Sequence, residues 1–265
     1  MSTNTDYLVF RLYGPMASWG EPAPGGERPS SLVPTRSAVL GLIAAALGIE
    51  RHDKPRLTEL ASSLLLGFKV ISPGRYLQDF HTAQVPSVNK KRPFLTRKEE
   101  LGLGPVNTVL SRRDYRCDGQ WIVAVWLNPA ATASRTLTDI AEHLKKPRFQ
   151  LYLGRKSCPL AAPLQPVLVN ENHVRAALDT PFADIAPAKH QVSVPANNTH
   201  SYYWQGDINH AGLTVAQRRQ VRTERVWDEP VDPTARLFES RVQHVWTQQH
   251  TAKKHADPEQ QGESS

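Results

Sequence analysis

The side chains best suited to chemistry lie around His81, in the segment DFHT (residues 79–82). An imidazole has a pKa near about 6.5, so it can accept and return a proton at neutral pH. Beside RNA it could assist cleavage by the 2′-hydroxyl without a metal, with Tyr76 or Lys90 contributing. The sequence shows no set of catalytic partners at a recognisable spacing around His81. We therefore keep catalysis by His81 and Tyr76 as an alternative and expect no catalytic residue.

Signatures of common enzymes and metal sites are absent from the sequence. It contains no GxxxxGK[ST], no GxGxxG after a strand, no HExxH and no GxSxG. Nucleotide hydrolysis and zinc-protease chemistry therefore have no support. The ten histidines and two cysteines are dispersed, without the close spacing of a zinc site. We expect a binding protein without a metal or other cofactor.

Basic residues gather in two stretches of a chain whose formal net charge is +7. Residues 86–116 contain eight basic and three acidic side chains, and residues 145–156 contain five basic ones and no acid. Together these stretches hold +10, so the remaining residues sum to −3. Segregated charge focuses a positive potential, which predicts a nucleic-acid partner. The alternative for either stretch alone is a solvated surface.

Two segments could hold a phosphate. A loop rich in glycine and proline (16–33) leads to a helix that begins in PTRS (34–37). The free N–H groups of a helix N-terminus bind anions, and Arg36 and Ser37 would add side-chain donors. Ordinary capping by Thr35 or Ser37 is the alternative. The second segment, GRKS (154–157), is a glycine turn with two cations.

Aromatic side chains accompany the first basic stretch. Phe80, Phe94 and Tyr115 could stack on exposed bases. Alternatively, Phe94 anchors a loop and Tyr115 belongs to the core, and the residue types leave both interpretations open.

A mixed α+β framework is expected to position these segments. Runs of β-branched and aromatic residues predict strands, and runs rich in alanine and leucine predict helices. Strands are expected at 7–13, 67–71, 121–127 and 149–153, and helices at 38–47, 57–66 and 136–144. This order, βαββαβ, is that of the ferredoxin-like or RNA-recognition-motif fold. A basic insertion at about 79–118 separates its second and third strands, and residues 79–108 show neither helical nor strand periodicity.

Composition divides the chain into three parts. Residues 1–165 form the main domain, 166–247 a small β-rich region, and 248–265 a polar tail expected to be disordered. In the second part we expect a short helix at 172–178 and strands at 201–204 and 223–227.

Nothing in the sequence predicts a membrane or secreted protein. The longest nearly unbroken apolar run, residues 38–49, is about 12 residues, whereas a membrane-spanning helix needs about 20. The N-terminus lacks the pattern of a secretory signal, and two cysteines do not make a disulfide framework. We expect a reducing, cytoplasmic setting.

Three segments together resemble the CRISPR-associated CasD family. They are YLVFRLYGPMASWG (7–20), PTRSAVLGLIAAALGI (34–49) and LYLGRKSCPL (151–160). DFHT (79–82) and RDYRCD (113–118) resemble two further segments that flank the thumb of that family. The resemblance runs in order through residues 7–165 and is loose beyond them. Residues 119–123 match poorly the aromatic signature of RNA-recognition strands.

The resemblance implies a subunit of type I-E Cascade, within the Cas5 family of the repeat-associated RNA-binding (RAMP) superfamily. Such a subunit holds the 5′ handle of the guide RNA (crRNA) in a modified RNA-recognition-motif domain. Its thumb reaches the backbone subunit CasC, another surface contacts the large subunit CasA, and target DNA is met indirectly through the complex. Relatives in type I-C systems cut precursor crRNA themselves, which keeps a metal-independent endoribonuclease as the alternative. A free-standing RNA- or DNA-binding regulator is a third possibility.

The residues and the resemblance together yield one set of candidate RNA contacts. They are Ser18, Trp19, Thr35, Arg36, Ser37, His81, Lys90, Lys91, Arg97, Arg112, Arg113, Tyr115, Arg155, Lys156 and Ser157.

Overall fold

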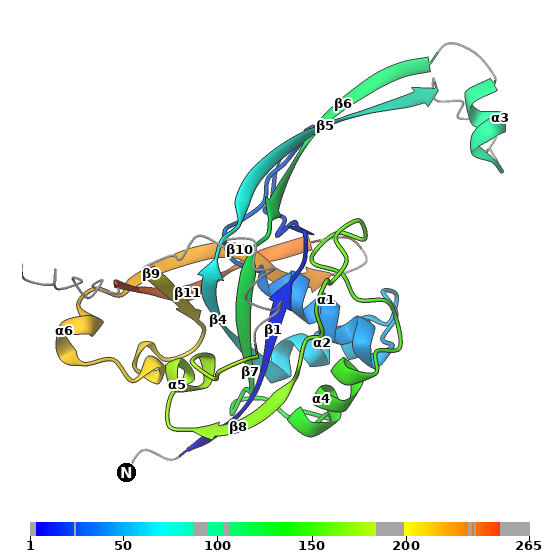
Figure 1. The fold of residues 1–265 in the computed structure, drawn as a ribbon. Coiled ribbons are helices and arrows are strands. Elements are labelled where there is room, and N and C mark those ends of the chain that lie inside the picture. The colour runs from blue at the N-terminus through cyan, green and yellow to red at the C-terminus, as the bar shows by residue number, and fades with distance from the viewer. Residues whose placement is uncertain are drawn as a thin grey trace, which may run out of the picture.

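A computed structural model describes residues 4–23, 25–86, 95–102, 106–183, 199–232, 235 and 237–249. They form a seven-stranded sheet with helices on both faces, and a four-stranded sheet that leaves the body as an arm (Figure 1). The mixed α+β class predicted from the sequence is confirmed. The strands are β1 (Thr5–Tyr13), β2 (Met16–Ala17), β3 (Glu27–Arg28), β4 (Leu64–Ser72), β5 (Arg75–Pro86), β6 (Val106–Cys117), β7 (Gln120–Leu127), β8 (Val167–Glu171), β9 (Thr199–Trp204), β10 (Arg222–Asp232) and β11 (Leu237–Gln249). The helices are α1 (Arg36–Leu47), α2 (Lys54–Ser63), α3 (Arg97–Gly102), α4 (Leu137–Lys145), α5 (Val174–Leu178), α6 (Val215–Arg218) and the 3-10 helix η2 (Ile208–Ala211).

Four antiparallel strands, in the spatial order β4, β7, β1, β8, occupy the part of the large sheet nearest the helices α1, α2 and α4. Along the chain, α1 and α2 separate β1 from β4, and α4 separates β7 from β8. The predicted strands at 7–13, 67–71 and 121–127 correspond to β1, β4 and β7 and are confirmed.

Strand β1 is buried on both faces, which accounts for its nearly continuous apolar sequence. Leu8 and Phe10 point into the cluster that includes α1, α2 and α4, whereas Tyr7 and Val9 point into the cluster that includes α5 and η2. All four side chains are fully buried. A polar residue at any of these positions would lie in a core, so the alternation of a half-exposed strand is absent.

The prediction of a strand at residues 149–153 is wrong, because the chain there forms no strand. Its main chain bonds to other elements instead, with the Phe149 N–H donating to the Ala45 oxygen at 3.1 Å and the Leu153 N–H to the Cys158 oxygen at 2.8 Å. Tyr152 forms an isolated bridge with Pro159. The next strand along the chain after α4 is β8, which pairs with β1.

The C-terminal strands extend the same sheet. Strand β9 pairs with β4, β11 pairs with β9, and β10 pairs with β11 at the edge. The predicted helix at 172–178 and strands at 201–204 and 223–227 are confirmed as α5, β9 and β10. The predicted division at residue 165 therefore falls within one continuous sheet. The tail expected to be disordered begins at residue 248, but residues 248 and 249 belong to β11, where they pair with β9. The rest of the predicted tail lies outside the described residues.

Helix α1 ends as the sequence predicts, because Gly48 adopts a left-handed conformation with φ 72° and its N–H caps the helix. The helix predicted at 57–66 is α2, whose chain passes into β4 at Leu64. Within the described part of the chain, no helix combines the length and apolar character needed to cross a membrane.

The arm is a ribbon of two long strands. Pairing between β5 and β6 runs from Arg75 opposite Cys117 to Pro86 opposite Val106, and α3 lies beyond the far end of the ribbon (Figure 1). Much of the segment 79–108, which shows no periodicity, thus belongs to strands. Both faces of the outer ribbon are exposed, so no alternation of apolar and polar residues marks them.

Candidate nucleic-acid interface

The base of the arm is built on β6. Strand β5 pairs with one side of β6, while β2 and β3 pair with its other side at Cys117 and Arg113 respectively. The loop that follows β1 is thereby fixed beside the arm. Sequence segments some 85 residues apart, such as Arg28 and Arg113, lie opposite each other in the sheet.

The glycine turn at 154–157 packs against the same place. The Ser18 N–H donates to the Leu153 oxygen at 3.0 Å. Gly154 has φ +82°, and a Cβ atom there would lie 1.9 Å from the Ser18 carbonyl oxygen. The next residue, Arg155, places its guanidinium 5.1 Å from the centre of the Tyr115 ring and donates to the Arg28 carbonyl oxygen at 3.3 Å. The glycine turn is therefore a neighbour of the loop that precedes α1, and both lie at the arm base.

Gly154→Ala is expected to lower the free energy of unfolding by about 2 kcal/mol or more, because it combines a left-handed backbone with a clash against backbone. Urea denaturation measures this loss. Gly41→Ala is the matched control, because Gly41 lies inside α1 with open space around it, and the same change there should stabilise by about 0.5–1 kcal/mol. Equal effects of the two changes would contradict the close packing of the turn.

Positive charge predominates at this site. The Arg112 guanidinium pairs with Glu27 at 3.1 Å, whereas Arg116 donates to the carbonyl oxygens of Ser30 and Ser31. Among the residues that the structure describes, Arg116 thus forms hydrogen bonds to main-chain oxygens and no ion pair. The cations of the arm base are Arg28, Arg112, Arg113, Arg116, Arg155 and Lys156. A concentration of cations such as this favours a phosphate backbone as ligand.

Several predicted contacts lie in the interior. Trp19 is 1% exposed and packs edge-on against Trp121, with ring centroids 5.2 Å apart. Ser18 is buried and its hydroxyl donates to the Asp114 oxygen at 3.1 Å. Tyr115 is also buried, under Arg155, in agreement with the core alternative. In these positions Ser18, Trp19 and Tyr115 support the base of the arm from beneath.

The start of α1 is occupied by the protein's own carboxylate. The Arg36 N–H donates to Asp228 Oδ2 at 2.6 Å, so this side chain fills the position proposed for a phosphate. The Arg36 side chain, 3% exposed, pairs with Glu229 at 2.7 Å and donates to Gln205 at 2.9 Å. Thr35 is buried beside it and Ser37 is half-buried. The start of α1, where the sequence predicts RNA binding, is therefore part of an internal ion network.

The remaining predicted RNA contacts lie at the arm tip, on the glycine turn or outside the described residues. Arg97, in α3, pairs with Glu100 at 2.5 Å and donates to the Gln84 oxygen. Lys156 and Ser157 are exposed on the glycine turn. Lys90, Lys91 and Phe94 lie outside the described residues.

The two residues of the catalytic alternative do not converge. Opposite residues of an antiparallel pair share a face, so Tyr76, opposite Arg116, and His81, opposite Ser111, lie on different faces of the ribbon. Five residues of strand also separate them by about 16 Å. His81 pairs instead with Asp79, with Nε2 and Oδ2 2.7 Å apart.

Sequence reasoning missed Arg28 as part of the site. It lies in a strand of two residues inside a loop rich in glycine and proline, and so short a strand leaves no periodic signal. The one feature of the sequence that could have indicated Arg28 is its positive charge. Its place in the cation cluster depends on the pairing of β3 with β6.

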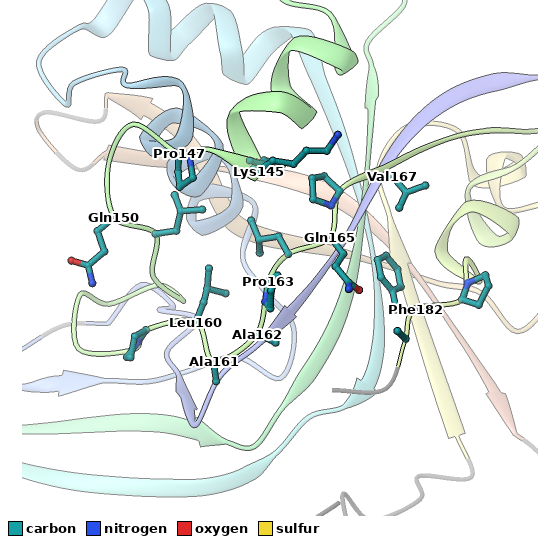
Figure 2. A pocket seen from close by; sticks show the side chains of 17 residues that line it. Lys145, Pro147, Gln150, Leu160, Ala161, Ala162, Pro163, Gln165, Val167 and Phe182 are labelled. Atoms are coloured by element: carbon teal, nitrogen blue, oxygen red, sulfur yellow. The ribbon is translucent and has the colours of Figure 1, made fainter. Parts of the chain in front are cut away.

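A groove of about 1030 Å³ lies between the end of α4 and the segment 159–167. Figure 2 shows Leu160, Pro163 and Phe182 among the side chains that line it, with Lys145 at its margin. Prolines, leucines and alanines dominate the lining. Such a surface suits an apolar partner better than a phosphate.

Comparisons with known proteins agree with this architecture. A family model described as CRISPR-associated protein (Cas_Cas5) matches residues 7–247. The CRISPR system Cascade subunit CasD of Escherichia coli (strain K12) is 37% identical over 166 residues, which cover 60% of this chain and 69% of that protein. One chain of a solved CRISPR RNA-guided surveillance complex matches with a TM-score of 0.58 and 23% sequence identity. The match covers 92% of this chain and 90% of the chain in the complex. A second solved structure, described as the crystal structure of a Cas protein, has a TM-score of 0.52 and 23% sequence identity. The match covers 92% of this chain and 94% of that one.

Proposed function

Since this chain belongs to the Cas5 family of CRISPR-associated proteins, we propose that it is a non-catalytic RNA-binding subunit of a CRISPR surveillance complex. It holds the repeat-derived 5′ handle of the crRNA. The observation that supports this proposal is the cluster of cations at the arm base, which three separate segments of the chain assemble. Phosphate contacts fix the register of an RNA strand, and neighbouring loops then read its bases.

The proposal extends to architecture and partners. The βαββαβ order of β1, β4, β7 and β8 corresponds to a ferredoxin-like domain, and the arm to the family's thumb. The outer part of the arm, where Leu95 is 91% exposed and Leu110 62% exposed, suits contact with the backbone subunit CasC. The groove of Figure 2 suits the large subunit CasA. The protein then acts in the cytoplasm within a type I-E complex and meets target DNA through it.

Purification of the tagged protein from its host, followed by sequencing of the bound RNA, tests this function. The expected result is a set of RNAs that begin with one repeat-derived sequence, together with further Cas subunits. A solitary protein without RNA would instead support the free-standing regulator.

A second candidate function is the metal-independent endoribonuclease, favoured by the pairing of His81 with Asp79 at 2.7 Å. Such a pair can orient an imidazole for proton transfer. Because Tyr76 faces away from this pair, we expect labelled repeat RNA to stay intact for hours in EDTA with the wild-type protein. Fragments ending in 2′,3′-cyclic phosphate that disappear with His81→Ala would overturn the non-catalytic proposal.

A further inference from the structure

One face of the arm carries an ordered row of side chains that phosphate binding does not require. Tyr76 lies opposite Arg116, Gln78 opposite Asp114, and Phe80 opposite Arg112. Because opposite and alternate residues of an antiparallel pair share a face, these six side chains form one surface. We call it the aromatic face. The Asp79–His81 pair lies on the other face.

Both rings of the aromatic face are exposed to solvent. Tyr76 is 54% exposed and Phe80 is 60% exposed. A guanidinium lies over each ring, with Arg116 5.5 Å from the centre of Tyr76 and Arg112 5.4 Å from that of Phe80. These cation–π contacts hold the rings in place while leaving more than half of each residue uncovered. An aromatic side chain fixed in this way loses little entropy when it stacks on a ligand.

The row between the rings is polar and offers partners for base edges. Gln78 donates to the Tyr76 hydroxyl at 3.1 Å and to Asp114 Oδ1 at 3.2 Å. A carboxylate repels phosphate but accepts hydrogen bonds from the amino groups of bases. The aromatic face is therefore suited to bases. The cations of the arm base that do not belong to this face, Arg28, Arg113, Arg155 and Lys156, are suited to phosphates.

The spacing of the rings limits what they can hold. Tyr76 and Phe80 are four residues apart on one strand, which is about 13 Å. Stacked neighbouring bases are only about 3.4 Å apart, so each ring takes a different base from an unstacked strand. Single-stranded RNA with splayed bases fits this surface, and a duplex does not.

We propose that the aromatic face is a platform on which two unpaired bases of the bound RNA stack, one on Tyr76 and one on Phe80. This inference rests on the proposed function, because the RNA is the one held at the arm base. A protein neighbour is the competing occupant. RNA is favoured because a cation accompanies each ring. The exposed Leu110 shares this face but lies beyond Phe80, opposite Thr82, on the side of the arm tip.

The test uses the full chain and a fluorescein-labelled single-stranded RNA copied from the host's repeat. Replacing Tyr76 and Phe80 by leucine keeps apolar side chains and leaves every cation in place. Each change is expected to weaken binding by about 5-fold to 140-fold, without altering the salt dependence. Val109→Ala is the matched control, because Val109 is 49% exposed on the opposite face of the ribbon, and it should leave binding unchanged.

An RNA of the same length with abasic residues separates stacking from charge. It should bind wild type and the double variant equally, since its phosphates remain and its bases do not. In a Phe80→Trp variant, the added fluorescence should be quenched by repeat RNA and not by the abasic strand. Thermal unfolding of each variant shows that the fold is retained.

Different failures lead to different conclusions. If wild type binds no RNA, the proposed function fails and the platform fails with it. If wild type binds RNA and the double variant binds it equally well, the platform alone is overturned. Unchanged RNA binding with lost assembly into the complex would assign the aromatic face to a protein neighbour and would also overturn the inference.

Discussion

Arg36→Met is expected to lower the free energy of unfolding by about 3–4 kcal/mol, because it removes one partner from a buried ion network. The guanidinium lies 2.7 Å from Glu229 and donates to the Leu64 oxygen at 3.0 Å and to Gln205 at 2.9 Å. Burial lowers the pKa of Arg36, and Glu229 opposes that effect. Methionine has similar length but cannot compensate the carboxylates, which would be left with fewer partners.

Urea denaturation of wild type and variant measures this loss, and a surface arginine provides the comparison. Arg135 pairs with Asp139 at 2.9 Å, but its side chain is 44% exposed. Arg135→Met should therefore cost less than about 1 kcal/mol. If Arg36 were a phosphate ligand rather than part of the core, Arg36→Met would instead weaken RNA binding and leave stability near that of wild type.

The Arg36 network also shows why the start of α1 was misinterpreted from sequence. The pattern at residues 34–37 predicts the helix and its start correctly. What occupies that start is Asp228, which is 192 residues away along the chain and is itself paired with Arg241 at 2.6 Å. Local sequence indicates which groups a helix terminus offers, whereas its partner here comes from β10, a strand distant along the chain that lies against α1.

The accuracy of the strand predictions follows the environment of each strand. The strands β1 and β7 are buried on both faces, so their continuous apolar runs identify them. The stretch at 149–153 has a similar composition, yet Phe149 and Tyr152 are 42% and 40% exposed. Its length alone could not distinguish a short strand from a packed loop.

For the candidate site, the sequence predicts a concentration of positive charge better than it predicts which side chains are exposed. A few basic residues of the stretches 86–116 and 145–156, namely Arg113, Arg155 and Lys156, come together with Arg28 on one surface. Residue type could not reveal that Tyr115 supports this surface from the core while Phe80 remains exposed. That difference arises because Tyr115 lies at the base of the ribbon, where Arg155 of the glycine turn covers its ring, whereas Phe80 lies farther along the ribbon.

Neutralising four cations of the arm base is expected to weaken RNA binding by between about 100-fold and 1000-fold at 0.1 M salt. The variant is Arg28→Gln, Arg113→Gln, Arg155→Gln and Lys156→Gln, which leaves Arg112 and Arg116 beside their rings. Each phosphate contact on a single strand contributes about 0.7 to the slope of log K against log salt. Four contacts thus account for about 2.8 decades between 0.1 M and 1 M salt.

The slope distinguishes phosphate contacts from a general effect of net charge. With about five contacts, wild type should give a slope near −3.5, and the variant should give a slope near −0.7. A control variant with Lys54, Arg51, Arg56 and Arg135 changed to glutamine removes the same charge from other parts of the surface. Its slope should stay near that of wild type, because the Debye length at 0.1 M salt is only about 10 Å. If both variants lose the same affinity, net charge rather than the arm base attracts the RNA, and the handle must be held elsewhere.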